Sequence, residues 1–130
     1  MPRFFNPKGN KYRARKTEYN GVTYDSMFEA AVAARLDSQC EAGVVQSYDR
    51  QVTVKVTAFD AQGKEHLLCT HRVDFLMHMP DGRKILLEAK GVQTPLYKQK
   101  LKLLKTFYLP FHDYEYQIVT QDTLLLLNRS

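Results

Sequence analysis

Two shortages in the sequence exclude whole classes of protein. Cys40 and Cys69 are the only cysteines, which is too few for a disulfide framework, and neither has the spacing of a metal site. No apolar stretch approaches the roughly 20 residues that cross a membrane, and residues 1–6 lack the apolar core of a signal peptide. The histidines lack zinc-type spacing. We therefore expect a cytoplasmic protein without a membrane span, in which both thiols are buried and reduced.

Acidic residues are missing from one long segment, so positive charge accumulates there. From Lys90 to His112 the chain has five lysines and neither aspartate nor glutamate, and residues 1–20 carry six basic residues against one glutamate. These segments hold eleven of the nineteen lysines and arginines of a chain whose net charge is +5. Clustered positive charge suggests nucleic acid as a partner, although a soluble tail and a solvated helix face would carry the same charges. The candidate DNA-binding residues are Lys11, Arg13, Arg15, Lys16, Lys98, Lys102 and Lys105.

Length and composition predict one globular domain. At 130 residues, of which 44% are hydrophobic, the chain can bury a single modest core. Proline, glycine and asparagine punctuate residues 1–17, which we interpret as a basic flexible arm. This arm either orders on DNA or on a partner subunit, or is simply a loose terminus. Residues 18–130 then form the domain.

The helix and strand signals give the order helix, three strands, helix, strand. One helix is expected over 26–42, and a second, begun by Thr94 and Pro95, over 95–109 with an end before Pro110. The αβββαβ order predicts an α/β fold with a mixed central sheet flanked by helices. Extended segments are expected at 44–48, 51–59, 65–79, 83–90 and 114–120, with turns at 20–21 and 60–63.

A turn between two apolar strands decides where the acidic residues lie. Pro80-Asp81-Gly82 suits a three-residue loop, in which a type I turn is followed by Gly82 in the left-handed conformation. That loop places Asp74 opposite Glu88 with Cβ atoms roughly 5 Å apart, an arrangement of like charges that a divalent cation would stabilise. A two-residue Asp81-Gly82 turn would instead send the two carboxylates to opposite faces of the sheet.

The surroundings of this acid pair favour a site over a solvated surface. Both strands are apolar nearly throughout, so both faces of the sheet should be covered, and a carboxylate inside them needs a partner. Lys90, two residues beyond Glu88, points to the same side of the sheet. The sequence thus predicts an acid pair and a lysine at one place, with His71 and Arg72 near enough to contact a substrate.

These motifs resemble the PD-(D/E)XK nuclease superfamily, and within it the small phage-borne nucleases of the Holliday-junction-resolvase kind. The likeness covers residues 11–119. Val73 stands where the name motif of the superfamily has proline, a departure that removes no metal ligand. The resemblance rests on Lys11-Tyr12, on Gly21-Val22-Thr23-Tyr24-Asp25-Ser26 before Glu29, on Asp74-Phe75, on Glu88-Ala89-Lys90-Gly91 and on the lysine-rich helix from Pro95 to Tyr108.

The resemblance implies a restriction-endonuclease-like core and a metal-dependent endonuclease that cuts DNA, most typically branched DNA such as Holliday junctions. It implies that Asp74, Glu88 and the backbone carbonyl of Ala89 ligate Mg²⁺, for which Mn²⁺ would substitute. Lys90 would orient the attacking water or stabilise charge on the phosphate. Two cuts at a junction ask for two active sites and hence a homodimer, and a phage-encoded enzyme would act in the host cytoplasm.

Glu29 and the overall function both retain alternatives. Ser26 and Glu29 fit a capping box, in which Glu29 only closes the helix end. The resemblance instead makes Glu29 a catalytic acid that completes the metal site or binds a second ion. The rival functions are a nuclease for single-stranded, nicked or flapped DNA, a DNA-binding module whose acid pair is inert, and a phage structural or adaptor protein.

Overall fold

The computed structural model describes residues 16–91 and 93–124. The predictions for residues 1–15, including the DNA contacts Lys11, Arg13 and Arg15, lie outside the described residues. Within the described ranges, no helix is long and apolar enough to cross a membrane. In chain order the elements are β1 (Thr17–Tyr19), β2 (Val22–Tyr24), α1 (Met27–Glu41), β3 (Ser47–Phe59), β4 (Glu65–His78), β5 (Lys84–Ala89), α2 (Pro95–Phe107), the 3-10 helix η1 (Leu109–Phe111) and β6 (Glu115–Val119).

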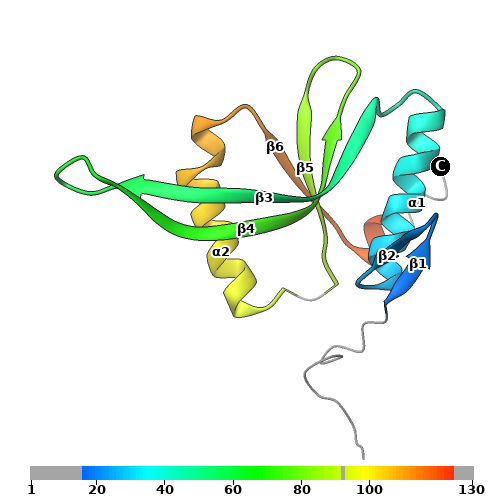
Figure 1. The fold of residues 1–130 in the computed structure, drawn as a ribbon, viewed down its shortest axis with the longest axis horizontal. Coiled ribbons are helices and arrows are strands. Elements are labelled where there is room, and N and C mark those ends of the chain that lie inside the picture. Colours follow the sequence, from blue (N-terminus) through cyan, green and yellow to red (C-terminus); the bar gives the residue numbers. More distant parts are fainter. Residues whose placement is uncertain (1–15, 92, 125–130) are drawn as a thin grey trace, which may run out of the picture.

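The central sheet is mixed, which confirms the predicted α/β class (Figure 1). Its strand order is β3-β4-β5-β6, with antiparallel pairing from β3 to β5 and parallel pairing between β5 and β6. Parallel neighbours need a crossover connection, and α2 supplies it because it lies between β5 and β6 in the chain.

A short hairpin of β1 and β2 precedes α1 and was not expected from the sequence. Thr17, which the sequence places in the basic arm, is the first residue of β1. Asn20 and Gly21 have φ of 52° and 79°, and two successive left-handed residues are what a type I′ turn requires. Only the turn was predicted, because strands of three residues are too short to show a periodicity.

The predicted ends of the helices and strands hold with small shifts. Ser26 caps α1 and Thr94 caps α2, each through a side-chain oxygen that accepts a backbone N–H three residues on. Helix α2 ends at Phe107, two residues before its predicted end, and Pro110 lies in the 3-10 helix η1 that follows. Strands β4, β5 and β6 lie within their predicted segments. The two extended segments predicted before them belong to one strand, β3, which begins only at Ser47.

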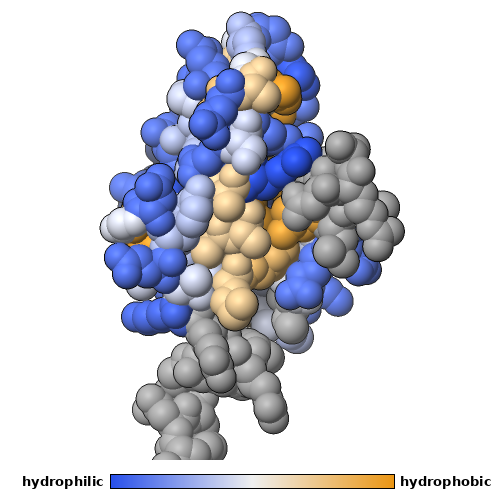
Figure 2. All heavy atoms as spheres, turned by 90° about the vertical axis from the view of Figure 1, so that its right-hand side faces the viewer, coloured by the Kyte–Doolittle hydropathy of each residue, from blue (hydrophilic) through white to orange (hydrophobic). Residues whose placement is uncertain are grey.

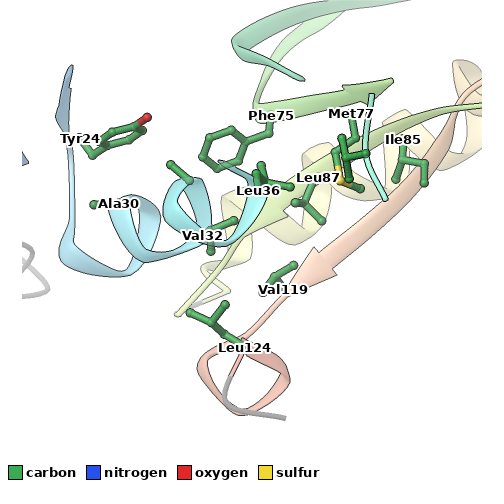
Figure 3. Close-up of a cluster of buried hydrophobic side chains, with 12 residues drawn as sticks. Tyr24, Ala30, Val32, Leu36, Phe75, Met77, Ile85, Leu87, Val119 and Leu124 are labelled. Carbon is green, nitrogen blue, oxygen red and sulfur yellow. The ribbon is translucent and has the colours of Figure 1, made fainter. Parts of the chain in front are cut away.

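Each face of the sheet carries a hydrophobic core, as the apolar runs of β4 and β5 predict. Adjacent residues of β5 serve opposite faces: Leu87 packs with α1, and Leu86 packs with Leu104 of α2. Figure 3 shows the α1 side, where Val32 and Leu36 point toward the strands. The sheet is therefore covered by α1 on one face and by α2 on the other.

Some apolar and thiol groups remain accessible at the surface. Figure 2 views the molecule from the side of α1 and shows apolar atoms gathered between polar ones. Among the exposed residues of helix α1 are Met27 and Ala31. Cys40 and Cys69 are free thiols that are only partly buried against the two cores, so the expectation of buried thiols is met in part.

The outer half of the β3–β4 hairpin extends beyond the rest of the sheet (Figure 1). β5 pairs with β4 only at residues 75–78, so among the described strands β3 is the one neighbour of the earlier part of β4. One face of this part is covered by α2, where Leu104 packs with Val54. Phe59 and Leu67, close to the tip, are exposed.

A left-handed residue in the middle of β3 exchanges the two sides of the strand. Gln51 has a φ of 52°, although it is not glycine and does not lie in a turn. Before it, Arg50 lies over the ring of Tyr24 on the α1 side; after it, Val52 and Val54 pack on the α2 side. An uninterrupted strand would put these even-numbered residues on one face. The paired strand β4 changes sides at the same level, because Val73 packs on the α2 side and Phe75 on the α1 side, so the exchange lies at Gln51 and Asp74.

We predict that position 51 prefers glycine to valine, the reverse of an ordinary strand position. Gln51→Gly should leave the free energy of unfolding unchanged or raise it by up to about 1 kcal/mol, because glycine adopts a left-handed φ without strain. Gln51→Val should lower it by about 1–2 kcal/mol, because a β-branched residue is strained there. Urea denaturation measures both changes. At Thr53, an exposed residue of the same strand, glycine should be the destabilising substitution. The same ranking at both positions would contradict the left-handed conformation.

Candidate active site

The turn between β4 and β5 is the three-residue loop that the sequence favours. The Met79 N–H donates to the Arg83 carbonyl at 2.9 Å, and the Gly82 N–H donates to the Met79 carbonyl at 3.0 Å. Gly82 has the expected left-handed φ, at 94°. The two-residue alternative, which would pair Pro80 with Arg83, is therefore wrong.

The register that follows from this turn brings the two strand acids together. Phe75 pairs with Leu87, as predicted, and one further step along the strands sets Asp74 opposite Glu88. At that step the hydrogen bond between the strands is made by a side chain instead of the backbone: the Ala89 N–H donates to Asp74 Oδ2 at 2.9 Å. The carboxylate of Asp74 is thus anchored on the residue that follows Glu88.

Burial and a neighbouring acid raise the pKa of Asp74 to about 6. Desolvation is the largest cause, and the charge of Glu88 adds to it. The Ala89 N–H, Lys90 and Arg72 lower the pKa, because each stabilises the ionised carboxylate. The charges of Glu88, Lys90 and Arg72 therefore all act on Asp74.

Glu88 is held by a histidine on the α2 side of the sheet. Its side chain is only 3% exposed, and Oε1 lies 2.5 Å from His71 Nε2. His71 is equally buried, with its ring near those of Tyr97 and Tyr116, and its Nδ1 has no partner among the described residues. The position of His71 therefore suits orientation of Glu88 better than the substrate contact expected from the sequence.

Glu29 reaches the site from the first turn of α1. Its backbone N–H donates to Ser26 Oγ at 3.0 Å, but among the described residues its carboxylate makes no hydrogen bond back to the Ser26 N–H. Only one half of the capping box is formed, and it does not use the Glu29 side chain. Burial raises the pKa of Glu29 to about 7, and the charges of Asp74 and Asp25 add to this. The carboxyl is therefore close enough to Asp74 to be affected by its charge and is not used for capping.

Lys90 is fixed at the end of β5. Its backbone N–H donates to the Val119 carbonyl of β6 at 2.9 Å. Its Nζ lies 4.4 Å from the centroid of the Tyr97 ring, a cation–π contact that orients the ammonium group. Since its charge also lowers the pKa of Asp74, Lys90 stands beside the acids as the sequence predicts.

The donor chemistry of the site fits a hard divalent cation such as Mg²⁺. Asp74 and Glu88 offer carboxylate oxygens and Ala89 a carbonyl, the oxygen ligands that this ion prefers. Burial and a neighbouring acid raise the pKa values of Glu29 and Asp74, and a bound cation would stabilise their ionised forms. Within residues 16–91 and 93–124, no three His, Cys, Asp or Glu side chains are arranged to hold a metal on their own. The set would therefore depend on the Ala89 carbonyl and on water as further ligands.

The predicted DNA contacts that the structure describes are all on the surface. Those on α2 follow one another at i, i+4 and i+7, which makes a single stripe. The same helix carries Tyr97, whose ring contacts Lys90, so the stripe begins next to the acids. The exposed candidates are Lys16, Lys98, Lys102 and Lys105.

Sequence reasoning missed one residue beside the acids, Arg50. The Cζ atom of Arg50 lies 4.5 Å from the centroid of the Tyr24 ring. Its charge, like that of Arg72, lowers the pKa of Glu29. Arg50 reaches this place through its pairing with Phe75 of β4, a contact between distant residues that no local sequence signal reports.

Comparison with known proteins places the chain in a family. A family model described as "Protein of unknown function (DUF1064)" matches residues 9–121. The chain belongs to the DUF1064 family. The matched segment of this DUF1064 protein contains every site residue described above. No curated protein and no solved structure matches the chain. The family description names no activity, so the chemistry has to be inferred from the side chains.

We predict that ionisation of Glu29 destabilises the protein as the pH rises. An unfolded glutamate ionises near pH 4.5, whereas folded Glu29 stays protonated up to about pH 7. Stability is therefore lost between these values and stays lower above them, by on the order of 2–3 kcal/mol. Glu29→Gln cannot ionise, so it should gain stability relative to the wild type between about pH 5 and about pH 8. Urea denaturation in EDTA measures this gain.

Ser26→Ala is the matched control, because it removes the helix cap and leaves the acid in place. It should lower the free energy of unfolding by about 1 kcal/mol, and by the same amount at about pH 5 and about pH 8. A Glu29→Gln variant that follows the wild-type pH dependence would show that this carboxyl is not protonated in the folded chain.

Proposed function

We propose that the protein is a metal-dependent endonuclease that hydrolyses phosphodiester bonds of DNA, with branched DNA such as Holliday junctions as its preferred substrate. The observation that carries the proposal is the bond of Asp74 to Ala89, which places Asp74 beside Glu88 and Lys90 at the end of β5, with Glu29 of α1 near enough to be affected by the charge of Asp74. Acids whose pKa values are raised by burial and by a neighbouring charge cost stability, and such groups gather at functional sites.

The order of the elements supports the same proposal. From α1 to β6 the chain runs helix, three strands, helix and strand, with the short η1 before the last strand. This is the order that the resemblance to the PD-(D/E)XK superfamily implies for a restriction-endonuclease-like core. In that scheme Glu29 is the acid of the first helix, Asp74 the strand acid, and Glu88 and Lys90 the paired motif.

Each residue has a role that suits its chemistry. Asp74, Glu88 and the Ala89 carbonyl would hold Mg²⁺ or Mn²⁺, and Glu29 would complete the site or hold a second ion. When bound, the ion would polarise the scissile phosphate and lower the pKa of an attacking water. Lys90, oriented by Tyr97, would position that water or stabilise negative charge on the phosphate.

The surroundings of the site suit a long, negatively charged substrate. The lysine stripe of α2 would bind phosphates beside the cut without reading bases. A junction has two strands to cut, so two copies related by a two-fold axis would supply the two sites. The basic segment before β1, residues 1–16, would clamp the DNA or the partner subunit.

One observation favours a second candidate, a DNA-binding module that does not cleave. The carboxylate of Glu88 is buried and bonded to His71, so it has to use its other oxygen, or move, to reach a metal ion. Such a module would bind DNA and give no product in Mg²⁺ or Mn²⁺.

Cleavage of a four-way DNA junction by the purified protein in Mg²⁺ tests the proposal. Asp74→Asn and Glu88→Gln should each lower the single-turnover rate by at least about 100-fold, because each weakens the stabilisation of charge in the transition state. Both variants should still bind the junction, because the lysine stripe is unchanged. Asp49→Asn makes the same carboxylate-to-amide change at an exposed position of β3 and should cleave at the wild-type rate.

Flap, nicked, duplex and single-stranded substrates, measured in parallel, define the substrate class. Faster cleavage of the junction supports the resolvase-like activity, and faster cleavage of the others supports the broader nuclease. An Asp74→Asn protein that cuts normally contradicts the metal assignment. A wild-type protein that binds DNA and gives no product in either ion supports the binding module.

We predict that the lysine stripe sets the salt dependence of DNA binding. Replacing Lys98, Lys102 and Lys105 together by glutamine should reduce the slope of log K against log salt by about 2–3, because each phosphate contact contributes roughly 0.9. Fluorescence anisotropy with a labelled junction in EDTA measures this slope. Replacing Lys64, an exposed residue beside the turn at the far end of the β3–β4 hairpin, is the control and should leave the slope unchanged.

A further inference from the structure

We propose that Arg50 and Arg72 form a phosphate-binding site next to the acidic cluster, on the side of the sheet that faces α1. The inference rests on the proposed function and deepens it, because it names the group of the substrate that this side of the site holds: a backbone phosphodiester of DNA that flanks the one being cut. Nothing in the lysine stripe of α2 performs this task, since the stripe lies on the other face.

Arg50 is held ready for a ligand by its neighbours. It pairs with Phe75, the residue after Asp74, so it lies level with the acids. Its guanidinium group sits over the Tyr24 ring, and its Nε is buried without a hydrogen-bond partner among the described residues. A cation–π contact fixes the plane of the group and leaves its N–H donors unused, which is the state a bidentate phosphate contact needs.

Arg72 approaches the same acids from β4. It precedes Asp74 by two residues, pairs with Thr53 across the hairpin and is exposed. The positive charges of Arg72 and Arg50 both act on Glu29, where they oppose the rise in its pKa. Neither arginine forms an ion pair with a carboxylate within the described part of the chain. Both guanidinium groups are thus close to the acids without being paired to them in the described part of the chain.

A strained residue adjoins the proposed site. A left-handed conformation costs a residue other than glycine roughly 1–2 kcal/mol, and such strain gathers at functional sites. Gln51, which has this conformation, follows Arg50 directly. Arg50 lies on the α1 side, as do Tyr48 and Phe75, and the side chains of β3 pass to the α2 side only after Gln51.

Positive charge on this side would favour the approach of a polyanionic substrate. Glu29, Asp74 and Glu88 together repel DNA, and the stripe on α2 compensates on one side only. Two guanidinium groups on the opposite side would grip the strand across the acids, with the fork geometry that matches phosphate oxygens. Arginine suits this better than lysine, because a planar fork loses less freedom when it binds.

Binding and cleavage of a labelled four-way junction test the inference in one set of variants. Arg50→Gln and Arg72→Gln should each weaken binding in EDTA by about 10-fold and reduce the salt slope by about 1, as expected for the loss of one phosphate contact. Arg50→Lys keeps the charge and loses the fork, so the slope should be retained while the affinity still falls. Arg83→Gln, the same change at the exposed tip of the β4–β5 hairpin, is the matched control and should alter neither quantity. Thermal unfolding of each variant verifies that it is folded.

The outcomes separate this inference from the proposed function. If the wild type cleaves and the Arg50 and Arg72 variants bind with the affinity and slope of the Arg83 control, the phosphate site is wrong and the nuclease stands. If binding depends on both arginines and no substrate is cleaved in Mg²⁺ or Mn²⁺, the phosphate site stands and the nuclease is wrong. A wild type that binds no DNA overturns both.

Discussion

The length of the turn at residues 80–82 determines the face to which the acids of the site point. Because side chains alternate along a strand, a turn shorter by one residue would move Asp74 and Glu88 to opposite faces of the sheet. Pro80 and Gly82 select the longer turn, and the hydrogen bonds of Met79 lock it. The turn at residues 80–82 therefore determines that the two acids meet, although it does not contact them.

Once the register is set, the acids impose a cost that their surroundings must offset. Glu29 and Asp74 are protonated more readily than free carboxyls, because burial disfavours their charged forms and a neighbouring acid adds to this, Asp74 in the case of Glu29 and Glu88 in the case of Asp74. Lys90 and the arginines act against this, and the Ala89 N–H holds Asp74 in place. Ionisable groups with strongly raised pKa values gather at functional sites, which is the reason for proposing one here.

What the sequence could predict follows from how local each signal is. The helix caps, the β4–β5 turn and the apolar strands depend on neighbouring residues, so the mixed sheet and the approach of Asp74 to Glu88 followed from pattern alone. The bond between His71 and Glu88 joins residues 17 positions apart and depends on the packing of α2, which no local pattern reports. The left-handed Gln51 carries no glycine signal, and the strands of the β1–β2 hairpin are too short for any periodicity.

The projecting part of the β3–β4 hairpin has a consequence for how the molecule comes apart. Two strands without further neighbours are marginal in water, and the turn at 60–63 has no core beneath it. Local unfolding of the hairpin should therefore start at this tip and extend inward as far as the side chains that pack against α2. The acids lie beyond that stopping point, so thermal breathing of the hairpin leaves their arrangement intact.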